Sequence, residues 1–387
     1  MAIENMEERI RQALTICFDA EVAQAAGLEN LGGHASLRIY WRVQLPQGPL
    51  LDSAQAPRGE YTQMAMVLPQ SDQALKSEEG MSSQDTPPDE LPFVNVHRYL
   101  DSIGAPVPDI DLVDMDLGVL LLEDLGDRTF EDAVDELRSS QDIEPEERED
   151  AFLDLYREPI ELLVDFQSRV LRSMVDASFG TNDDCVGFER GFDRELLRWE
   201  LDHYLEWGLD ARLQDTEKLD THRDALNAIF DRLVDDLLGY QQTLVLRDYQ
   251  SRNLMHKGDD WFIIDFQDAL KGPAIYDLVA LLRDSYIELN ELQVDRLLHD
   301  YIAMGEQRGL PWCADEDAVI EAFYLQTIQR KLKDAGRFVY IDRVKGNPSF
   351  LQYYDSSIRY VKEAIAKAPG YDDLAVILED VESSWSR

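Results

Sequence analysis

The most constraining feature of this sequence is an alternation of short apolar segments with Asp and Asn side chains around position 250. Residues 244–246 (Leu-Val-Leu) predict a short buried strand, and Asp248 and Asn253 follow it. Residues 253–255 and 262–264 predict a pair of strands around a Lys-Gly-Asp-Asp turn, and Asp265 ends the second of them. We therefore expect three oxygen-bearing side chains at the ends of neighbouring strands.

These three side chains match what phosphoryl transfer requires. A carboxylate such as that of Asp248 can orient an attacking hydroxyl and accept its proton. Magnesium prefers oxygen ligands and usually takes one or two carboxylates beside phosphate oxygens, which suits Asn253 and Asp265. Asp and Asn are also common in ordinary turns, so one such residue alone would indicate nothing. The spaced set predicts phosphoryl transfer with ATP and Mg²⁺ as cofactors.

Length and apolar content describe a globular chain. The 387 residues are enough for two packed lobes. There is no run of eighteen apolar residues, and the N-terminus is acidic where a signal peptide would be basic, so we expect a cytoplasmic protein. Cys17, Cys185 and Cys313 lack the spacing of a metal site, and their odd number argues against a disulfide framework.

The net charge limits the possible partners. The chain has 78 Asp and Glu residues against 37 Lys and Arg residues, for a net charge of −41. Such a surface repels nucleic acid and anionic membranes, so we expect neither as a partner. It also repels ATP unless local cations and magnesium compensate. We expect a small-molecule substrate and no obligate protein partner.

The same charge predicts a fold that depends on salt and indicates a salt-tolerant source. Between about 10 mM and 1 M salt the screening length falls from roughly 30 to 3 Å. Repulsion among the excess acidic side chains should weaken over this range, so the melting temperature should rise. An unchanged melting temperature, measured by calorimetry at both salt concentrations, would contradict this prediction.

The first third of the chain alternates helix and strand patterns. Apolar residues at helical spacing predict one amphipathic helix over residues 6–23. Gly32 and Gly33 precede a strand pattern in 34–43; their backbone could approach phosphate oxygens, although a glycine pair is commonly only a turn. Residues 61–68 predict another strand, and residues 69–92, rich in Ser, Asp, Gln, Gly and Pro, predict a mobile surface loop.

The remaining patterns divide the chain into two lobes. After a helix predicted over 93–103, residues 118–127 form an apolar strand that runs into an acidic turn. This strand end could pair with an adenine edge, or it could be a core strand without a ligand. We interpret residues 123–128 as a hinge between an N-lobe (1–122) and a C-lobe (129–387). Helical patterns dominate the C-lobe, at residues 151–175, 194–207, 219–238, 274–288, 291–305, 316–335 and 353–368.

Several motifs carry a resemblance to a known family. They are LLEDLGDR (121–128), LRDYQSRNLM (246–255), IDFQDA (264–269), YDLVALLRD (276–284) and QRKLKDAG (329–336), with further segments at 35–42 and 192–203. With these the chain resembles the aminoglycoside phosphotransferase/choline kinase superfamily, and within it the bacterial N-acetylmuramate/N-acetylglucosamine anomeric kinases of cell-wall recycling. The resemblance implies an α+β, bilobal protein-kinase-like fold with a small β-rich N-lobe and a larger, mainly α-helical C-lobe.

The resemblance also implies an activity and roles for individual residues. The activity is transfer of phosphate from ATP to the anomeric hydroxyl of an N-acetylated amino sugar, giving a sugar 1-phosphate. Asp248 would be the catalytic base, in contact with the sugar hydroxyl, and Asn253 and Asp265 would hold Mg²⁺, with Asp268 close by. The nucleotide would be bound by the glycine turn and the hinge, at Gly32, Gly33, Ser36, Glu123 and Leu125.

Two departures from the family pattern stand out. Most members have histidine where this chain has Leu246, two residues before the base. The predicted strand at 61–68 also lacks the lysine that usually pairs with the α/β-phosphates. Arg38 or Arg42 could replace that lysine, although arginines on the strands of an acidic protein are commonly partners in surface ion pairs.

The sugar site should offer planar polar groups and a stacking face. The candidates for substrate binding are Glu200, His203, Arg330 and Lys333, beside the aromatic residues Trp199, Tyr204 and Trp207. Aromatic residues at helical spacing fit a core equally well. Asp277 and Arg283, on the helix that follows Pro273, are predicted to brace the catalytic loop.

Two other functions stay open on the sequence alone. The acceptor could be choline, homoserine, a methylthiosugar or an aminoglycoside, with the chemistry unchanged. Alternatively, Leu246 and the missing lysine would fit a nucleotide-binding pseudokinase, although Asp248, Asn253 and Asp265 are all retained.

Overall fold

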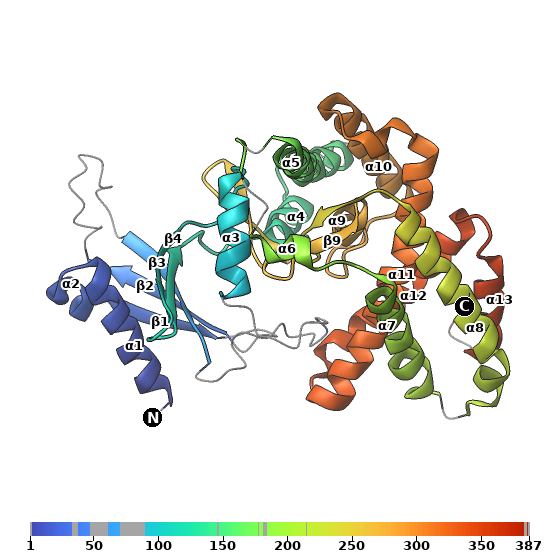
Figure 1. Cartoon of the computed structure of the whole chain (residues 1–387), viewed down its shortest axis with the longest axis horizontal. Coiled ribbons are helices and arrows are strands. Elements are labelled where there is room, and N and C mark those ends of the chain that lie inside the picture. The colour runs from blue at the N-terminus through green and yellow to red at the C-terminus, as the bar shows by residue number, and fades with distance from the viewer. Residues whose placement is uncertain are drawn as a thin grey trace. The chain divides into compact units, whose positions relative to one another are not determined.

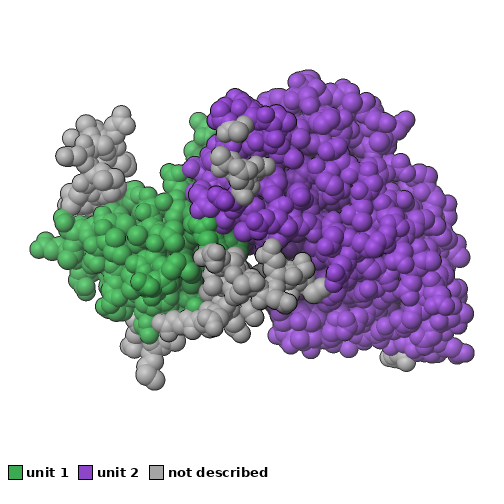
Figure 2. All heavy atoms as spheres, in the orientation of Figure 1, with its two compact units in different colours: residues 1–94, 106–128, 255–264 green, residues 95–105, 129–254, 265–387 purple. Residues whose placement is uncertain are grey.

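A computed structural model describes residues 2–32, 38–46, 61–69, 90–144, 147–176, 178–180, 184–213, 215–382 and 385. They form two compact units, each discontinuous in sequence (Figure 2). Unit 1 comprises residues 1–94, 106–128 and 255–264, and unit 2 comprises residues 95–105, 129–254 and 265–387. The lobe boundaries predicted at residues 122 and 128 stay a prediction. The loop predicted over 69–92 falls almost wholly outside the described residues.

Unit 1 is built on a five-stranded antiparallel sheet (Figure 1). Its strands run in the order β1-β2-β3-β5-β4 and comprise β1 (Gly27–Gly32), β2 (Ile39–Leu45), β3 (Tyr61–Val67), β4 (Ile110–Asp114) and β5 (Val119–Glu123). Alternate residues of β2, namely Trp41, Val43 and Leu45, are buried on one face, as the period of two in a half-buried strand requires. The strands predicted in the second half of 34–43, over 61–68 and at the start of 118–127 are confirmed, whereas β1 and β4 were not predicted.

Helices α1 (Ala2–Cys17) and α2 (Ala20–Ala25) bury their apolar residues in the same core as the sheet. The prediction of one helix over residues 6–23 is wrong, because the chain turns at Phe18 and Asp19. The backbone of Asp19 is extended and starts a second helix. This turn lets Phe18 pack into the core. On α1, Arg9 donates to the carbonyl oxygens of Leu117, Leu68 and Gly118 at 2.5, 3.0 and 2.8 Å.

The predicted strand pair near residue 260 is confirmed as β7 (Leu254–Lys257) and β8 (Asp260–Ile263). Gly258 occupies the turn with φ of +66°, a conformation that strongly favours glycine. Two backbone hydrogen bonds attach the pair to unit 1. The N–H of His256 donates to Arg128 O and the N–H of Ile263 donates to Pro106 O, both at 2.8 Å.

Unit 2 is mainly helical. Its helices are most of α3 (Pro92–Ser102), with α4 (Phe130–Ser139), α5 (Arg148–Val175), α6 (Val186–Glu189), α7 (Arg194–His203), α8 (Glu217–Gly239), α9 (Tyr276–Leu282), α10 (Glu291–Arg308), α11 (Glu316–Lys345), α12 (Tyr354–Lys367) and α13 (Asp372–Val381). A π-helical segment, Tyr204–Asp210, continues α7. A two-stranded sheet pairs β6 (Gln242–Val245) with β9 (Leu270–Pro273).

Helix α11 forms the centre of unit 2. Every residue from Phe323 to Leu332 is buried, so neighbouring elements surround the helix on all sides. The helix was predicted to end at residue 335 but continues to Lys345, because Gly336 serves close packing here. A Cβ at this position would lie 2.8 Å from the Cα of Tyr204. The helix stops instead at Gly346, where φ is +69°.

Polar contacts hold helix α3 in place within unit 2. The side chain of Asn95 donates to Asp184 O and accepts from the N–H of Val186, each at 2.8 Å. One turn further on, the Tyr99 hydroxyl lies 2.7 Å from Ser173 Oγ on α5. Within the ranges given above, no helix is long and apolar enough to cross a membrane.

Candidate active site

The loop that carries Asp248 leaves the end of β6 and is held by two buried carboxylates. Asp277, on α9, accepts the N–H of Leu246 at 2.7 Å and the N–H of Arg247 at 3.0 Å. Asp284 accepts the N–H and the hydroxyl of Ser251 at 2.9 and 2.5 Å. Both acids are almost entirely inaccessible to solvent. The two ends of the loop are therefore fixed from the interior of unit 2.

These contacts support only one of the two residues predicted to brace the loop. Asp277 has the predicted role, and burial raises the pKa of its carboxyl to about 7 against the donation from the two backbone N–H groups. The interpretation of Arg283 as a brace is wrong, because its guanidinium binds Glu291 and Glu363 at 2.8 and 3.0 Å. Asp284, the next residue, makes the brace instead.

Backbone strain singles out the same region. In the part of the chain that the structure describes, Arg247 and Asp265 are the non-glycine residues with positive φ, at 72° and 60°. A non-glycine residue in the left-handed region is uncommon and persists only when its surroundings enforce it. Both residues belong to the segment that the sequence predicted to be chemical, and such strain is concentrated at functional sites.

Asp248 keeps 40 % of its side-chain surface exposed, and Arg330 Nη2 lies 3.7 Å from its Oδ1. Desolvation raises the pKa of the Asp248 carboxyl, and the negative charge of Asp265 adds to this, whereas Arg330 and Lys333 oppose it. The carboxylate is therefore more basic than an ordinary aspartate and remains accessible. These are the properties that a general base needs.

Asn253 and Asp265 have oxygen atoms of the kind that binds a magnesium ion. The amide nitrogen of Asn253 donates to Asp248 O at 2.8 Å, which leaves its Oδ1 as the atom that can bind a metal. Gln267 Nε2 donates to Asp265 Oδ1 at 2.8 Å and to Asp268 Oδ2 at 3.3 Å. No group of three His, Cys, Asp or Glu residues could hold a metal within the described ranges. An amide oxygen and a carboxylate nevertheless fit magnesium, which takes its other ligands from phosphates and water.

Arg247 is a further residue of this loop that was not predicted from the sequence. Its guanidinium lies 3.3 Å from Glu200 Oε1 and 5.5 Å from the ring centre of Phe192, and its carbonyl oxygen accepts from Arg330 at 2.9 Å. Its position in the sequence, directly before Asp248, is the feature from which a role in this loop could have been predicted. Leu246 is buried, so apolar packing at this position adds to the carboxylate contacts that hold the loop.

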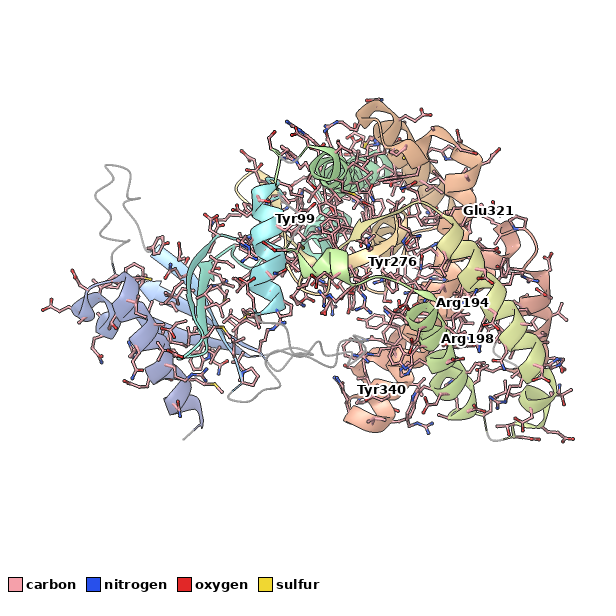
Figure 3. The ribbon with its side chains drawn as sticks, viewed as in Figure 1. Tyr99, Arg194, Arg198, Tyr276, Glu321 and Tyr340 are labelled. Carbon is pink, nitrogen blue, oxygen red and sulfur yellow. The ribbon has the colours of Figure 1, made fainter. Side chains whose placement is uncertain are left out.

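The predicted sugar-binding residues occupy α7 and α11. Glu200 is fully buried, and its second oxygen accepts from Gln329 at 2.7 Å, so both of its oxygens hold protein partners. Arg330 is 2 % exposed and lies over the ring of Tyr276, labelled in Figure 3. Lys333 Nζ lies 3.5 Å from Asp334 Oδ1. Direct sugar contact by any of them stays a prediction.

The aromatic residues on α7, on the π-helical segment that continues it and on the neighbouring part of α11 separate into two groups. His203 stacks on Trp199 with ring centres 5.4 Å apart, and it also meets Trp207 at 6.3 Å and Tyr340 at 5.3 Å. The rings of Trp199, Trp207 and Tyr340 are half-buried. Tyr204 has no exposed surface and belongs to the core.

The predicted nucleotide-binding residues belong to unit 1. Gly33 and Ser36 lie outside the described residues, whereas Gly32 ends β1 with φ of +82°. Glu123 Oε1 binds Lys257 Nζ at 2.6 Å, and Leu125 is buried.

Arg42 and Arg38 were the candidates to replace the missing lysine. Arg42 binds Asp124 and Asp127 at 2.8 and 2.7 Å, which matches the ion-pair interpretation. Arg38 lies next to β2, directly before Ile39.

Comparison with known proteins identifies the family. The model of the phosphotransferase enzyme family matches residues 81–314. This chain belongs to the phosphotransferase enzyme family. The matched residues include the loop of Asp248, Asn253 and Asp265. The two strained residues of this phosphotransferase, Arg247 and Asp265, therefore lie within the part that matches the family.

Curated relatives share more of the chain. An N-acetylmuramate/N-acetylglucosamine kinase from Pseudomonas putida is 30 % identical over 302 residues, which is 77 % of this phosphotransferase and 81 % of the relative. An N-acetylmuramate/N-acetylglucosamine kinase from Neisseria meningitidis is 31 % identical, over 77 % of this chain and 84 % of its own. The resemblance stated from the sequence motifs is confirmed.

Solved structures share the fold. A choline/ethanolamine kinase family protein from Mesorhizobium loti superposes with a TM-score of 0.55 at 14 % identity, over 96 % of this chain and 99 % of the other. Wild-type aminoglycoside 2'-phosphotransferase-IIIa, solved as its GDP complex, gives 0.51 at 13 % identity, over 92 % and 98 %. These likenesses confirm the predicted α+β, protein-kinase-like fold class.

Proposed function

We propose that this phosphotransferase transfers phosphate from ATP to the anomeric hydroxyl of N-acetylmuramate and N-acetylglucosamine, giving sugar 1-phosphates. The observation that carries the proposal is the state of Asp248. Its side chain is exposed, its pKa is raised, and the strained residue Arg247 directly before it fixes its place in the loop. The kinase names of the relatives at about 30 % identity support the choice of acceptor.

Asp248 would accept the hydroxyl proton in this mechanism. The anomeric hydroxyl is more acidic than an ordinary alcohol, so a carboxylate of moderately raised pKa suffices and positioning contributes more than basicity. Arg330 steadies the base from a distance of 3.7 Å. Two buried carboxylates and the ion pair of Arg247 with Glu200 keep the loop in place, which supports orientation of the base before substrate arrives.

Asn253 and Asp265 would hold the magnesium ion. When bound, that ion neutralises charge on the phosphates. Gln267, which donates to both Asp265 and Asp268, would orient the carboxylate of Asp265 toward it. The nucleotide would be bound by Gly32, Gly33, Ser36 and Arg38 at its phosphates and by the backbone from Glu123 to Leu125 at its base.

We propose that this activity takes place in the cytoplasm, in cell-wall recycling, because it would use ATP and act on the acceptor named for the relatives. There the amino sugars would be released from peptidoglycan as free reducing sugars. The anomeric hydroxyl would then be available without prior activation.

A panel of acceptors tests the proposal. ADP release would be followed with N-acetylmuramate, N-acetylglucosamine, choline, homoserine, a methylthiosugar and an aminoglycoside, at low and at high salt. We expect the two N-acetylated sugars to stimulate ADP release well above the rate without acceptor. Stimulation by one of the other acceptors alone would assign the same chemistry to another substrate.

A further inference from the structure

Helices α7 and α11 lie against each other over several turns, and their contacts follow one another along both helices. Gln329 binds Glu200 at the first level. At the next, a Cβ on Gly336 would lie 2.9 Å from His203 O. Beyond that, the ring of Tyr340 meets Trp207 at 5.2 Å, edge to face.

The half-buried rings Trp199, Trp207 and Tyr340, together with His203, form what we call the aromatic surface (Tyr340 is labelled in Figure 3). A pyranose ring has an apolar face, and aromatic rings of this kind are common partners for it. The aromatic surface continues from the turn of α7 that holds Glu200. Through Arg247, Glu200 is linked to the loop of Asp248.

Three cationic side chains of α11 lead from Asp248 toward the aromatic surface. They are Arg330, Lys333 and Arg337, at spacings of three and four residues that place them on one side of a helix. With a rise of 1.5 Å per residue, Lys333 is about 4.5 Å and Arg337 about 10.5 Å along the axis from Arg330. The guanidinium of Arg337 lies 5.6 Å from the ring centre of Tyr340.

Two acidic side chains next to these cations already have two partners each within the protein. Asp334 accepts from Lys331 at 2.9 Å and lies 3.5 Å from Lys333, so two ammonium groups share one carboxylate. Glu200 binds Arg247 and Gln329. In a chain with 78 acidic and only 37 basic residues, a row of cations beside the base and the aromatic surface points to an anionic ligand.

We propose that Lys333 and Arg337 bind the carboxylate of the lactyl substituent of N-acetylmuramate, and that these two residues favour this acceptor over N-acetylglucosamine. The inference rests on the proposed function. The two sugars differ only by that lactyl ether at position 3 of the ring, two ring carbons from the anomeric carbon. With the anomeric hydroxyl at Asp248, beside Arg330, a sugar ring lying along α11 would direct the substituent toward Lys333 and Arg337. Arginine and lysine form strong charge-assisted hydrogen bonds with a carboxylate.

The test compares three acceptors: N-acetylmuramate, its methyl ester and N-acetylglucosamine. For the unaltered protein we expect a kcat/KM for the acid about 10- to 100-fold above that for the neutral ester, the range expected for hydrogen bonds to a charged group. Arg337→Met and Lys333→Met should each reduce this ratio of acid to ester. Arg337→Lys should restore part of it. Arg343→Met, on an exposed arginine of the same helix that pairs with Asp342, is the matched control and should leave the ratio as it was.

Each outcome has a distinct meaning. Equal kcat/KM for acid and ester in the unaltered protein would overturn the carboxylate site without requiring any variant to fold. An unchanged ratio of kcat/KM for acid and ester in both Met variants would also overturn the carboxylate site. In either case turnover of N-acetylglucosamine would leave the proposed function standing. No phosphorylation of any of the three acceptors would overturn the proposed function and this inference together.

Discussion

Asp248→Asn should lower kcat for the amino sugar by about 10²- to 10⁴-fold, the usual contribution of a positioned general base. The change removes the group that accepts the hydroxyl proton and keeps the size of the side chain. Nucleotide binding, measured by calorimetry with a non-hydrolysable ATP analogue, should stay close to that of the unaltered protein, because the predicted nucleotide-binding residues lie elsewhere in the chain. Asp259→Asn, in the exposed turn between β7 and β8, is a matched control with the same chemical change.

The pH dependence tests the same role. Desolvation raises the pKa of Asp248 in the folded protein, and the base works only when it is deprotonated. The rate should therefore rise with pH through a pKa above the ordinary aspartate value of 3.8, and this rise should be absent from the residual activity of Asp248→Asn. A variant as active as the parent would remove Asp248 from the chemistry.

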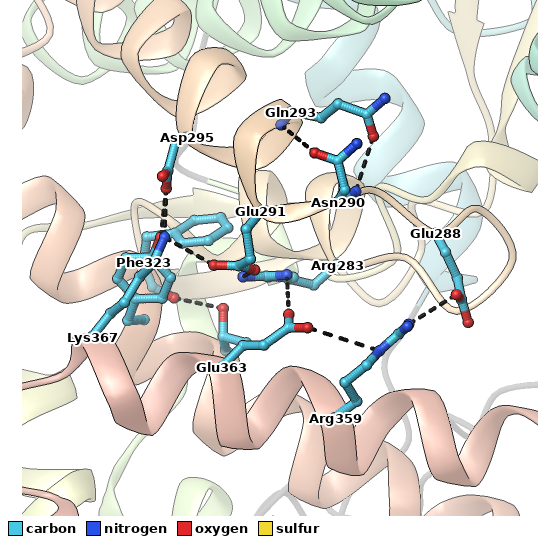
Figure 4. A network of polar contacts seen from close by, with 12 residues as sticks. Arg283, Glu288, Asn290, Glu291, Gln293, Asp295, Phe323, Arg359, Glu363 and Lys367 are labelled. Carbon is cyan, nitrogen blue, oxygen red and sulfur yellow. Dashed lines mark hydrogen bonds and ion pairs between the residues drawn. The ribbon is translucent and has the colours of Figure 1, made fainter.

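Arg283→Met should destabilise the folded protein by about 3–5 kcal/mol, the range found when one partner of a buried ion pair is removed. Arg283 has no exposed surface and binds Glu291 and Glu363 at 2.8 and 3.0 Å (Figure 4). Burial, followed by the hydrogen bond with Glu291, raises the pKa of the Glu363 carboxyl, whereas the positive charge of Arg283 lowers it. Without the guanidinium both acids would lose their central partner.

Arg359→Met is the matched control for this prediction. Arg359 is 47 % exposed and binds Glu288 at 2.9 Å and Glu363 at 3.9 Å, so the loss should not exceed about 1 kcal/mol, as for surface ion pairs. Free energies of unfolding from denaturant titration, at high salt, would measure both variants. Equal losses for the two arginines would contradict the account of Arg283 as the buried centre of this network.

The catalytic loop was predictable because its signal is local. Asp248, Asn253 and Asp265 lie within eighteen residues, between apolar segments whose strand character can be read directly. Strands β2, β3 and β5 and most of the long helices were predictable for the same reason. The activity was predictable from the family resemblance of the motifs, and a relative named as an N-acetylmuramate/N-acetylglucosamine kinase is 30 % identical over 77 % of the chain.

The remainder depended on partners distant in sequence. Glu200 reaches Gln329 across 129 residues, and Arg283 reaches Glu363 across 80, so nothing local distinguished a sugar ligand from a buried ion-pair partner. The division of α1 from α2 depends on Phe18 packing into the core, and the extension of α11 depends on Gly336 lying against α7. Periodicity alone carries no information on such contacts.

The most direct test of the central claim is proton and phosphorus NMR of the protein with Mg-ATP and N-acetylmuramate or N-acetylglucosamine, at low and at high salt. We expect an anomeric proton split by coupling to phosphorus, which only a phosphate bonded at the anomeric oxygen can produce. If the sugar carries no phosphorus at that position at both salt concentrations, although ATP is bound, the result would contradict an anomeric kinase.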